Sequence, residues 1–412
     1  MKRTHALLAG FCTAALLCWT LPTQAARNDN DGVSADTIRV GGVLDLEGQS
    51  RGLGQAMKAG IDAAFKDVKV RGHKLEYVAV NDSYTPELTV RGTQSLIDSG
   101  IFAMLGNVGT PTAKVSLPIL AQNHVPAVGF FTGAGLLRPG EGDVVNYRAS
   151  YAEEAAAVID QALDHGVEPA EICAYVQNDA YGMSGVEGIK QALSRKPRTR
   201  AIIDSLDKIL AMSGDNPARN NVGPVGVYQR NTLISREGYD SLKHWETTQN
   251  VQCKLVVSVG TYNAIGRFVG YSRYKGEDWV VSAVSFTGAD NLKNVLTQFG
   301  VHDRFIMTQV VPPLDEQLPI IQEARQALGE QFGYVSLEGY IVGKMFIAIL
   351  NHVDGDFTRA NFMRAAKGQS FDVGGIQLSF RHSNQGSTLV STTYFNGQSY
   401  VDMNDALWRS LL

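Results

Sequence analysis

The residues that carry most enzymatic chemistry are scattered along this chain. Its eight histidines include no pair at the three- or four-residue spacing with which a helix presents two metal ligands. The segment 182–185 does not have the Gly-x-Ser-x-Gly spacing of a nucleophile elbow. Gly52 and Gly54 lack the third glycine of a dinucleotide-binding loop, and no phosphate-binding Gly-Lys-Ser/Thr motif occurs. We therefore expect no enzymatic activity, no metal and no cofactor.

Six segments that directly follow predicted strands combine glycines, hydroxyl groups and aromatic rings. In open α/β sheets, ligands bind outside the carboxyl ends of the strands, so such segments hold the materials of a binding pocket. Packing between lobes is the better explanation for any single aromatic residue, but together the segments indicate a cleft. They are Gly109 to Thr112, Phe130 to Gly133, Asp179 to Gly182, Tyr228 to Asn231, Gly260 to Asn263 and Ser285 to Thr287.

Thr110 is predicted to be the N-cap of a helix that has Pro111 in its first position. The free backbone N–H groups of such a helix would hold a carboxylate. A cap without any ligand is an equally good interpretation.

The elements that must position these segments alternate between strand and helix patterns. Strands are predicted at 37–44, 74–80, 102–105 and 127–131, with helices at 56–65, 86–99 and 111–123. A second series of the same kind begins near residue 149 and ends at residue 311. Its strands are predicted at 172–177, 225–228, 255–259, 279–286 and 305–311, with helices at 151–165, 183–194, 237–248, 263–274 and 289–299. This alternation predicts parallel sheets covered on both faces, so the expected fold class is α/β with two doubly wound lobes.

The remainder of the chain follows a break at Pro312 and Pro313. Two helices, predicted at 320–332 and 337–352, have no sheet of their own and are expected to pack on the first lobe. The end of the chain alternates polar and apolar residues around Asn396-Gly397, as in a hairpin. The segment 208–222 is interpreted as a surface insertion. The predicted domains are 36–148 plus 312–370 for the first lobe, 149–311 for the second lobe, and 371–412 for a C-terminal crossover and hairpin.

The chain has 37 Lys and Arg against 41 Asp and Glu, a net charge of −4, and no basic run. Nucleic acid and anionic membrane surfaces are therefore not expected partners. Residues 1–25 are predicted to be a signal peptide, because a basic start and an apolar stretch precede the small residues of a cleavage site at Thr23 and Ala25. No later stretch reaches the roughly 18 apolar residues of a membrane-spanning helix. We expect an exported protein.

Removal of residues 1–25 leaves two cysteines, Cys173 and Cys253, each near the start of a predicted strand. Two buried thiols are one interpretation. A disulfide is the other, since an oxidising compartment permits the bond and neighbouring strands would meet its geometry.

Six motifs follow one another along the chain. They are Asp82-Ser83-Tyr84-Thr85-Pro86, Phe130-Phe131-Thr132-Gly133-Ala134, Asp179-Ala180-Tyr181-Gly182, Tyr228-Gln229-Arg230-Asn231, Val259-Gly260-Thr261-Tyr262 and Leu337-Glu338-Gly339-Tyr340. Their order and spacing resemble type I periplasmic substrate-binding proteins, and more narrowly the leucine/isoleucine/valine-binding protein family that feeds ABC importers. The resemblance runs from about Thr37 to Val401.

The resemblance implies two lobes that are joined by three crossovers and close on a small ligand. The crossovers are expected near Tyr147-Arg148, near Val311-Pro312 and within 365–375. Thr110 and Thr132 would bind a ligand carboxylate from the first lobe, and aromatic residues of the second lobe would close over it. The expected ligand-binding residues are Thr110, Phe131, Thr132, Tyr181, Tyr228, Tyr262 and Phe286. The same strand order would place the strands of Cys173 and Cys253 side by side.

The resemblance leaves the ligand class open. In amino-acid-binding members, an acidic residue after the third strand of the second lobe pairs with the ligand's ammonium, and the matching position here is Ala264. Amino acids, neutral or aromatic carboxylates, amides and other small organic molecules therefore all stay possible. Asp82 and Asp179 would either supply the missing charge or form turns.

The function implied is that of a monomeric periplasmic binding component. Ligand binding would shift an open population to a closed one, which docks on an ABC-transporter permease in the inner membrane. The alternative is a sensory module that presents the same closed form to a receptor or kinase.

Overall fold

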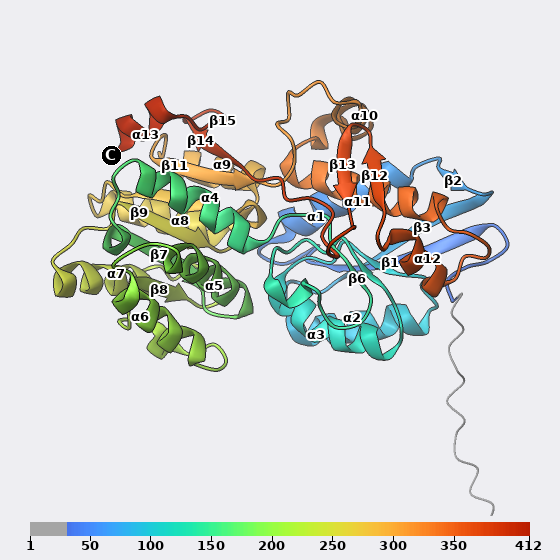
Figure 1. Ribbon diagram of the computed structural model, residues 1–412, viewed down its shortest axis with the longest axis horizontal. Helices are drawn as coiled ribbons and strands as arrows, with labels where there is room; N and C mark the ends of the chain where they lie inside the picture. Colours follow the sequence, from blue (N-terminus) through green and yellow to red (C-terminus); the bar gives the residue numbers. More distant parts are fainter. Residues whose placement is uncertain (1–30) are drawn as a thin grey trace, which may run out of the picture.

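The computed structural model describes residues 31–412. The signal peptide predicted over residues 1–25 lies outside this range. Two α/β lobes lie side by side, each with a mostly parallel sheet and helices packed around it (Figure 1). The predicted fold class is confirmed.

The first lobe has a six-stranded sheet in the order β2-β3-β1-β4-β5-β6, in which only β2 is antiparallel to its neighbour. Its strands are β1 (Thr37–Leu44), β2 (Lys69–Val70), β3 (His73–Asn81), β4 (Met104–Leu105), β5 (Ala127–Val128) and β6 (Val144–Val145). The helices between them are α1 (Arg51–Phe65), α2 (Pro86–Asp98), α3 (Thr110–Gln122) and the short η1 (Gly135–Leu137).

Three helices from the later part of the chain return to this lobe. They are α10 (Pro319–Leu328), α11 (Tyr334–Asn351) and α12 (Arg359–Ala366). α11 packs along α1, and the two backbones approach so closely that a Cβ on Gly60 would stand 2.1 Å from the Ser336 carbonyl oxygen. A Cβ on Gly339 would stand 2.3 Å from the Met57 carbonyl oxygen. The predicted packing of the two late helices on the first lobe is confirmed.

The second lobe has a seven-stranded sheet in the order β15-β14-β11-β10-β9-β7-β8. Its parallel strands are β7 (Ile172–Gln177), β8 (Val225–Tyr228), β9 (Leu255–Val259), β10 (Val280–Ala283) and β11 (Phe305–Gln309). Antiparallel β14 (Ser391–Phe395) and β15 (Tyr400–Asp402) form the predicted hairpin. The helices are α4 (Tyr151–Asp164), α5 (Ala180–Ser194), α6 (Arg200–Ala211), α7 (Arg236–Gln249), α8 (Tyr262–Tyr274), α9 (Ala289–Gln298) and the terminal α13 (Asp405–Leu411), with the short η4 (Ser285–Thr287) after β10.

The chain passes between the two sheets three times. The first two passages lie where predicted, and the Tyr147 hydroxyl joins them by donating to the Val310 carbonyl oxygen at 2.9 Å. The third prediction, 365–375, is wrong. β12 (Ser370–Val373) and β13 (Ile376–Ser379) still pack on the first lobe because alternate residues bury apolar side chains there, so the chain crosses between residues 380 and 390.

The third passage runs beside the first. The Gly386 N–H donates to the Asn146 carbonyl oxygen at 2.9 Å, and the Ser387 N–H donates to that of Tyr147 at 2.8 Å. Figure 1 shows β12 and β13 in one lobe and β14 and β15 in the other. The three passages together form the hinge.

The interpretation of 208–222 as a surface insertion is only partly correct, because most of residues 212–222 lie at the surface but the segment also includes the end of a helix. Its first four residues belong to α6, whose buried Ile202, Leu206 and Ile209 form one helical face. The following loop folds around Arg219, which is only 2% exposed. This guanidinium donates to the carbonyl oxygens of Ile209 at 3.2 Å and Gly214 at 2.6 Å, so the loop is fixed to the lobe.

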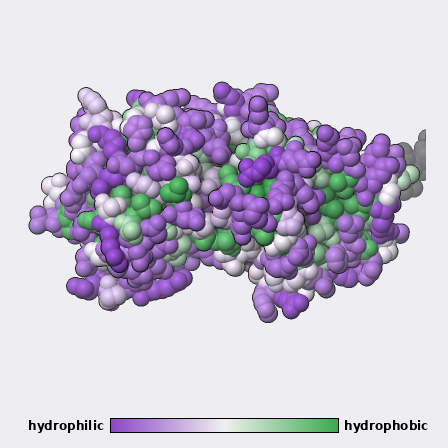
Figure 2. Space-filling view, turned by 90° about the horizontal axis from the view of Figure 1, so that it is seen from above, coloured by the Kyte–Doolittle hydropathy of each residue, from purple (hydrophilic) through white to green (hydrophobic). Residues whose placement is uncertain are grey.

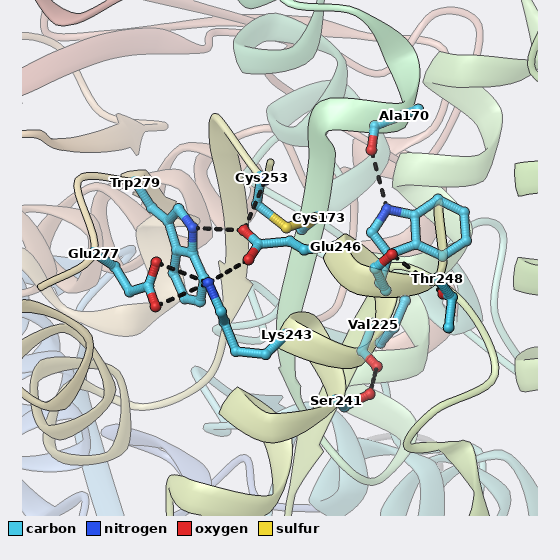
Figure 3. The surroundings of a disulfide bond; sticks show 11 residues. Ala170, Cys173, Val225, Ser241, Lys243, Glu246, Thr248, Cys253, Glu277 and Trp279 are labelled. Atoms are coloured by element: carbon cyan, nitrogen blue, oxygen red, sulfur yellow. Dashed lines mark hydrogen bonds and ion pairs between the residues drawn. A yellow bond between two sulfur atoms is a disulfide. The ribbon is translucent and has the colours of Figure 1, made fainter. Parts of the chain in front are cut away.

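Cys173 and Cys253 form a disulfide, with their Cα atoms 5.8 Å apart. β7 and β9 are parallel neighbours, which brings the two residues together at the amino ends of these strands. In Figure 3 the Glu246 carboxylate lies beside the bond, accepting from the Cys253 N–H at 2.9 Å and from the Trp279 indole at 3.0 Å. Lys243 forms an ion pair with the same carboxylate. Of the two interpretations from sequence, the disulfide is confirmed.

Hydrophilic side chains cover most of the face seen in Figure 2, and hydrophobic ones form separate patches. Across residues 31–412, none of the helices combines the length and the apolar character needed to cross a bilayer.

Candidate functional site

The carboxyl ends of the parallel strands in the two lobes face each other, and the loops that follow them are in contact. The Tyr262 hydroxyl donates to the Gln49 carbonyl oxygen at 3.1 Å, and the Asn263 amide donates to the same oxygen at 2.7 Å. Further along, the Tyr334 N–H donates to the Asp290 carboxylate at 2.9 Å. The lobes are therefore closed on each other.

Five aromatic side chains meet at the centre of this interface, and we call them the ring cluster: Tyr84, Phe131, Tyr151, Tyr181 and Phe286. Phe286 lies at its centre, with ring centroids 5.0 Å from Phe131, 4.7 Å from Tyr181 and 6.3 Å from Tyr84. The Tyr151 ring lies 5.3 Å from that of Tyr181. All five side chains are buried. The structure thus brings together three predicted site residues, and adds Tyr84 and Tyr151, which the sequence did not single out as site residues.

The turn after β3 directs Tyr84 into the cluster. Ser83 and Tyr84 have φ values of 48° and 56°, a left-handed conformation that L-residues seldom adopt. The Asp82 carboxylate holds this turn by accepting from the Tyr84 N–H at 2.9 Å and from the Thr89 hydroxyl at 2.7 Å. Gly109 leaves room for the ring, because a Cβ there would stand 2.3 Å from Tyr84 Cε2.

Thr110 and Thr132 lie side by side, with their hydroxyl oxygens 2.7 Å apart. The Tyr151 hydroxyl donates to Thr132 Oγ1 at 3.2 Å, which links the pair to the ring cluster. The predicted N-cap role of Thr110 is wrong. Gly109, with a φ of 108°, occupies the cap position, and Thr110 is the first helical residue, so its hydroxyl is free to bond Thr132.

Tyr228 and Tyr262 lie outside the ring cluster. Tyr228 stacks on Tyr175 inside the second lobe, at 5.2 Å, and its hydroxyl donates to the Gln177 side-chain oxygen at 3.3 Å. The Gln177 amide in turn donates to the Tyr84 hydroxyl at 3.2 Å, so Tyr228 supports the cluster from behind. Tyr262 instead contacts the loop before α1.

Asp82 and Asp179 both act as turn-formers. The Asp179 carboxylate caps α5 by accepting from the Tyr181 N–H at 2.9 Å, and it accepts from the Gln177 amide at 2.8 Å. Arg230 lies 3.5 Å from it. Burial raises the pKa of both carboxyl groups, that of Asp82 to about 6.

A group of buried charges adjoins the ring cluster at the hinge. Arg148, in the first passage, is 0% exposed, and its guanidinium carbon lies 4.9 Å from the Phe131 ring centre. Its nitrogens lie 3.4 Å from Glu154 of the second lobe and 3.6 Å from Glu338 of the first. Burial raises the pKa of Glu338 to about 7; Arg148 lowers it and Glu154 adds to the rise. For Arg148, burial alone would lower the pKa, but the two carboxylates outweigh it and the net direction is upward.

Sequence spacing gave no signal for this group. Arg148 follows a strand of two residues, and Glu338 lies inside a helix far along the chain, so only the topology brings them together. Glu338 does stand in a motif, Leu337-Glu338-Gly339-Tyr340, that carried the family resemblance.

A cavity of about 470 Å³ opens beside the ring cluster, between η1 of the first lobe and the start of α4 and α5 in the second. Gly133 lines it and also touches the cluster, since a Cβ there would stand 2.7 Å from Tyr151 Cδ1. Within residues 31–412, no three His, Cys, Asp or Glu side chains are grouped to hold a metal ion.

Comparisons with known proteins agree with this architecture. The family profile described as periplasmic binding protein matches residues 37–197. A crystal structure of a possible leucine/isoleucine/valine-binding protein from Rhodopirellula baltica SH 1 is 32% identical, covers 94% of this chain and 100% of its own, and superposes with a TM-score of 0.79. The chain belongs to the leucine/isoleucine/valine-binding family of periplasmic binding proteins.

Other structures of this fold are more distant. A branched-chain amino acid ABC transporter protein from Thermus thermophilus with bound valine is 15% identical, with a TM-score of 0.70 and coverages of 92% and 99%. An ABC-transporter solute-binding protein from R. palustris in complex with 4-hydroxybenzoate is also 15% identical, with a TM-score of 0.69 and coverages of 90% and 96%. No curated protein sequence matches the chain.

Proposed function

We propose that this member of the leucine/isoleucine/valine-binding family is the periplasmic solute-binding component of an ABC importer. It captures a small organic molecule between its lobes and delivers the closed form to an inner-membrane permease. One observation carries the proposal. Side chains from both lobes converge at the carboxyl ends of the strands, where parallel α/β sheets bind ligands. Two structures of the same fold hold small organic molecules, valine in the Thermus protein and 4-hydroxybenzoate in the R. palustris protein.

Hinge closure couples binding to transport. A ligand shifts the population toward the closed form only through contacts that it makes better there than in the open form. The proposed contacts come from Thr110, Phe131 and Thr132 on one side and from Tyr181 and Phe286 on the other. Tyr228 and Tyr262, also predicted to bind ligand, have other roles in this proposal: Tyr228 supports the cluster and Tyr262 secures closure. The protein is proposed to act as a monomer and to catalyse no reaction.

A thermal-shift screen of the protein without its predicted signal peptide tests this function. The library holds amino acids, small carboxylates, amides and aromatic acids. A ligand that binds only the folded state stabilises it by about 2.7 kcal/mol at a hundredfold excess over Kd, so a ligand raises the melting temperature by several degrees.

Two variants show where a ligand binds. Tyr181→Ala is expected to abolish the shift, because the side chain is buried in the ring cluster. Tyr274→Ala, at a side chain that is 85% exposed, is expected to preserve it. A shift that survives in Tyr181→Ala contradicts the interlobe site.

A further inference from the structure

The group of buried charges beside the ring cluster contains polar atoms without hydrogen-bond partners. Among the residues that the structure describes, Arg148 Nε and Nη1 and Glu338 Oε1 have none. Arg148 is 0% and Glu338 3% exposed. Their facing atoms, Nε and Oε1, are 3.6 Å apart, which is too long for a hydrogen bond. Buried polar atoms are nearly always paired, so this unmet donor and acceptor need a common partner.

Glu154, in contrast, is fully engaged. Its carboxylate accepts from the Ser285 N–H at 2.7 Å, from the Thr308 hydroxyl at 2.5 Å and from the Ser285 hydroxyl at 3.1 Å. Since it also pairs with the guanidinium of Arg148, it already balances that positive charge. Because Glu154 already balances Arg148, a ligand carboxylate here would bring an uncompensated negative charge into a buried site.

The unmet atoms specify the polar group of the ligand. Arg148 needs an acceptor, and Glu338 needs a donor directly beside it. A carboxylate offers only acceptors and a protonated amine only donors, whereas a carboxamide offers one oxygen and one N–H group on the same carbon. A carboxamide is also uncharged, so burying it costs less than burying an ion.

The surroundings specify the rest of the ligand. The guanidinium lies over the Phe131 ring, and Phe286 follows at 5.0 Å from that ring. A flat or branched apolar group would replace these ring contacts at little cost.

We propose that Arg148 and Glu338 form the polar end of the interlobe site and select a small carboxamide whose apolar or aromatic body packs against Phe131 and Phe286. This inference rests on the proposed function. Phe131 belongs to the first lobe and Phe286 to the second, so a ligand body packed against both rings joins the lobes and favours the closed form.

Matched ligand sets test the selection by isothermal titration calorimetry near neutral pH. One set is benzamide, benzoate and benzylamine, and the other is isovaleramide, isovalerate and isoamylamine. The amide of at least one set is expected to bind about tenfold tighter than its acid and its amine.

Three variants locate the effect. Glu338→Leu removes the acceptor and is expected to weaken amide binding by about tenfold. Glu338→Gln keeps an acceptor oxygen and is expected to change amide affinity by less than about threefold while improving the binding of the acid. Glu323→Gln, at the exposed partner of Lys344, is the control and is expected to change nothing. Circular dichroism and melting confirm that each variant folds.

The inference is overturned if an acid or amine binds as tightly as its amide, if Glu338→Leu leaves amide affinity unchanged, or if neither amide binds. Its failure differs from failure of the proposed function. Suppose that a carboxylate or an amino acid binds the parent protein but does not bind the Tyr181→Ala variant. This result would overturn the inference that the ligand is a carboxamide, and would still support a ligand site between the lobes.

Discussion

The phenol oxygen of Tyr262 in the second lobe joins two backbone groups of the first lobe, donating to the Gln49 carbonyl oxygen at 3.1 Å and accepting from the Gly52 N–H at 3.4 Å. Opening of the lobes separates these groups, so the bonds stabilise only the closed form. Tyr262→Phe is expected to raise the Kd of any interlobe ligand about fivefold, the equivalent of one hydrogen bond. Titration calorimetry measures this change. Tyr274→Phe, at an exposed tyrosine, is the control, and equal Kd values for both variants would contradict the role of Tyr262.

The disulfide is expected to contribute strongly to stability. Cys173 and Cys253 are separated by 80 residues, and cross-linking a loop of this size restricts the unfolded chain by roughly 4 kcal/mol. The double variant Cys173→Ala/Cys253→Ala is therefore expected to melt several degrees below the parent protein. Reductant should lower the melting temperature of the parent and leave the double variant unchanged. A reductant effect on the variant would point to a different cause.

Glu338 is expected to make stability depend on pH. Burial raises its pKa from 4.5 to about 7, so the folded protein holds a proton that the unfolded chain releases. The stability gained from this proton is present below pH 4.5 and is lost as the pH rises through about 7. Glu338→Gln cannot ionise, and is expected to melt above the parent at pH 8, by up to about 3 kcal/mol of unfolding free energy, with a smaller difference at pH 5. Melting curves of the variant and the parent at both pH values test this expectation. If the variant gains more stability at pH 5 than at pH 8, the raised pKa of Glu338 is contradicted.

Arg219 is expected to stabilise the second lobe. Its replacement by Met leaves the carbonyl oxygens of Ile209 and Gly214 without their buried donor, at a cost of about 3 kcal/mol. Urea unfolding measures this loss. The control is Arg236→Met, at a side chain that is 79% exposed, with an expected change within about 0.5 kcal/mol. Equal stability of the two variants would mean that the loop after α6 is not fixed by this side chain.

The fold was largely predictable because it depends on local patterns. β7, β8 and β9 have the predicted bounds, since each is a short, fully buried run flanked by turn residues. β5 ends earlier than predicted because Gly129 turns the chain with a φ of 56°. α6 was missed because the polar interpretation of 208–222 began inside its last turn.

The site was only partly predictable. Phe131, Tyr181 and Phe286 were expected at the lobe interface because a position just after a strand can be recognised from the local sequence, and their binding of a ligand stays a prediction. Arg148 and Glu338 were not, because neither follows a long strand, and their proximity exists only after the chain has crossed between the lobes. Tyr84 stands in a recognised motif, but the direction of its ring depends on the left-handed backbone conformation of Ser83 and Tyr84. The local sequence does not predict that conformation.

The three passages between the lobes mean that neither core is encoded by one continuous segment. α1 stays uncovered until α11 exists, and β11 lacks its outer neighbour until β14 is made. During synthesis the chain therefore cannot complete either lobe until its last part leaves the ribosome. Such late, long-range contacts slow folding. This protein is proposed to be exported across the inner membrane before it functions. Slow folding would keep the chain unfolded for long enough to be translocated.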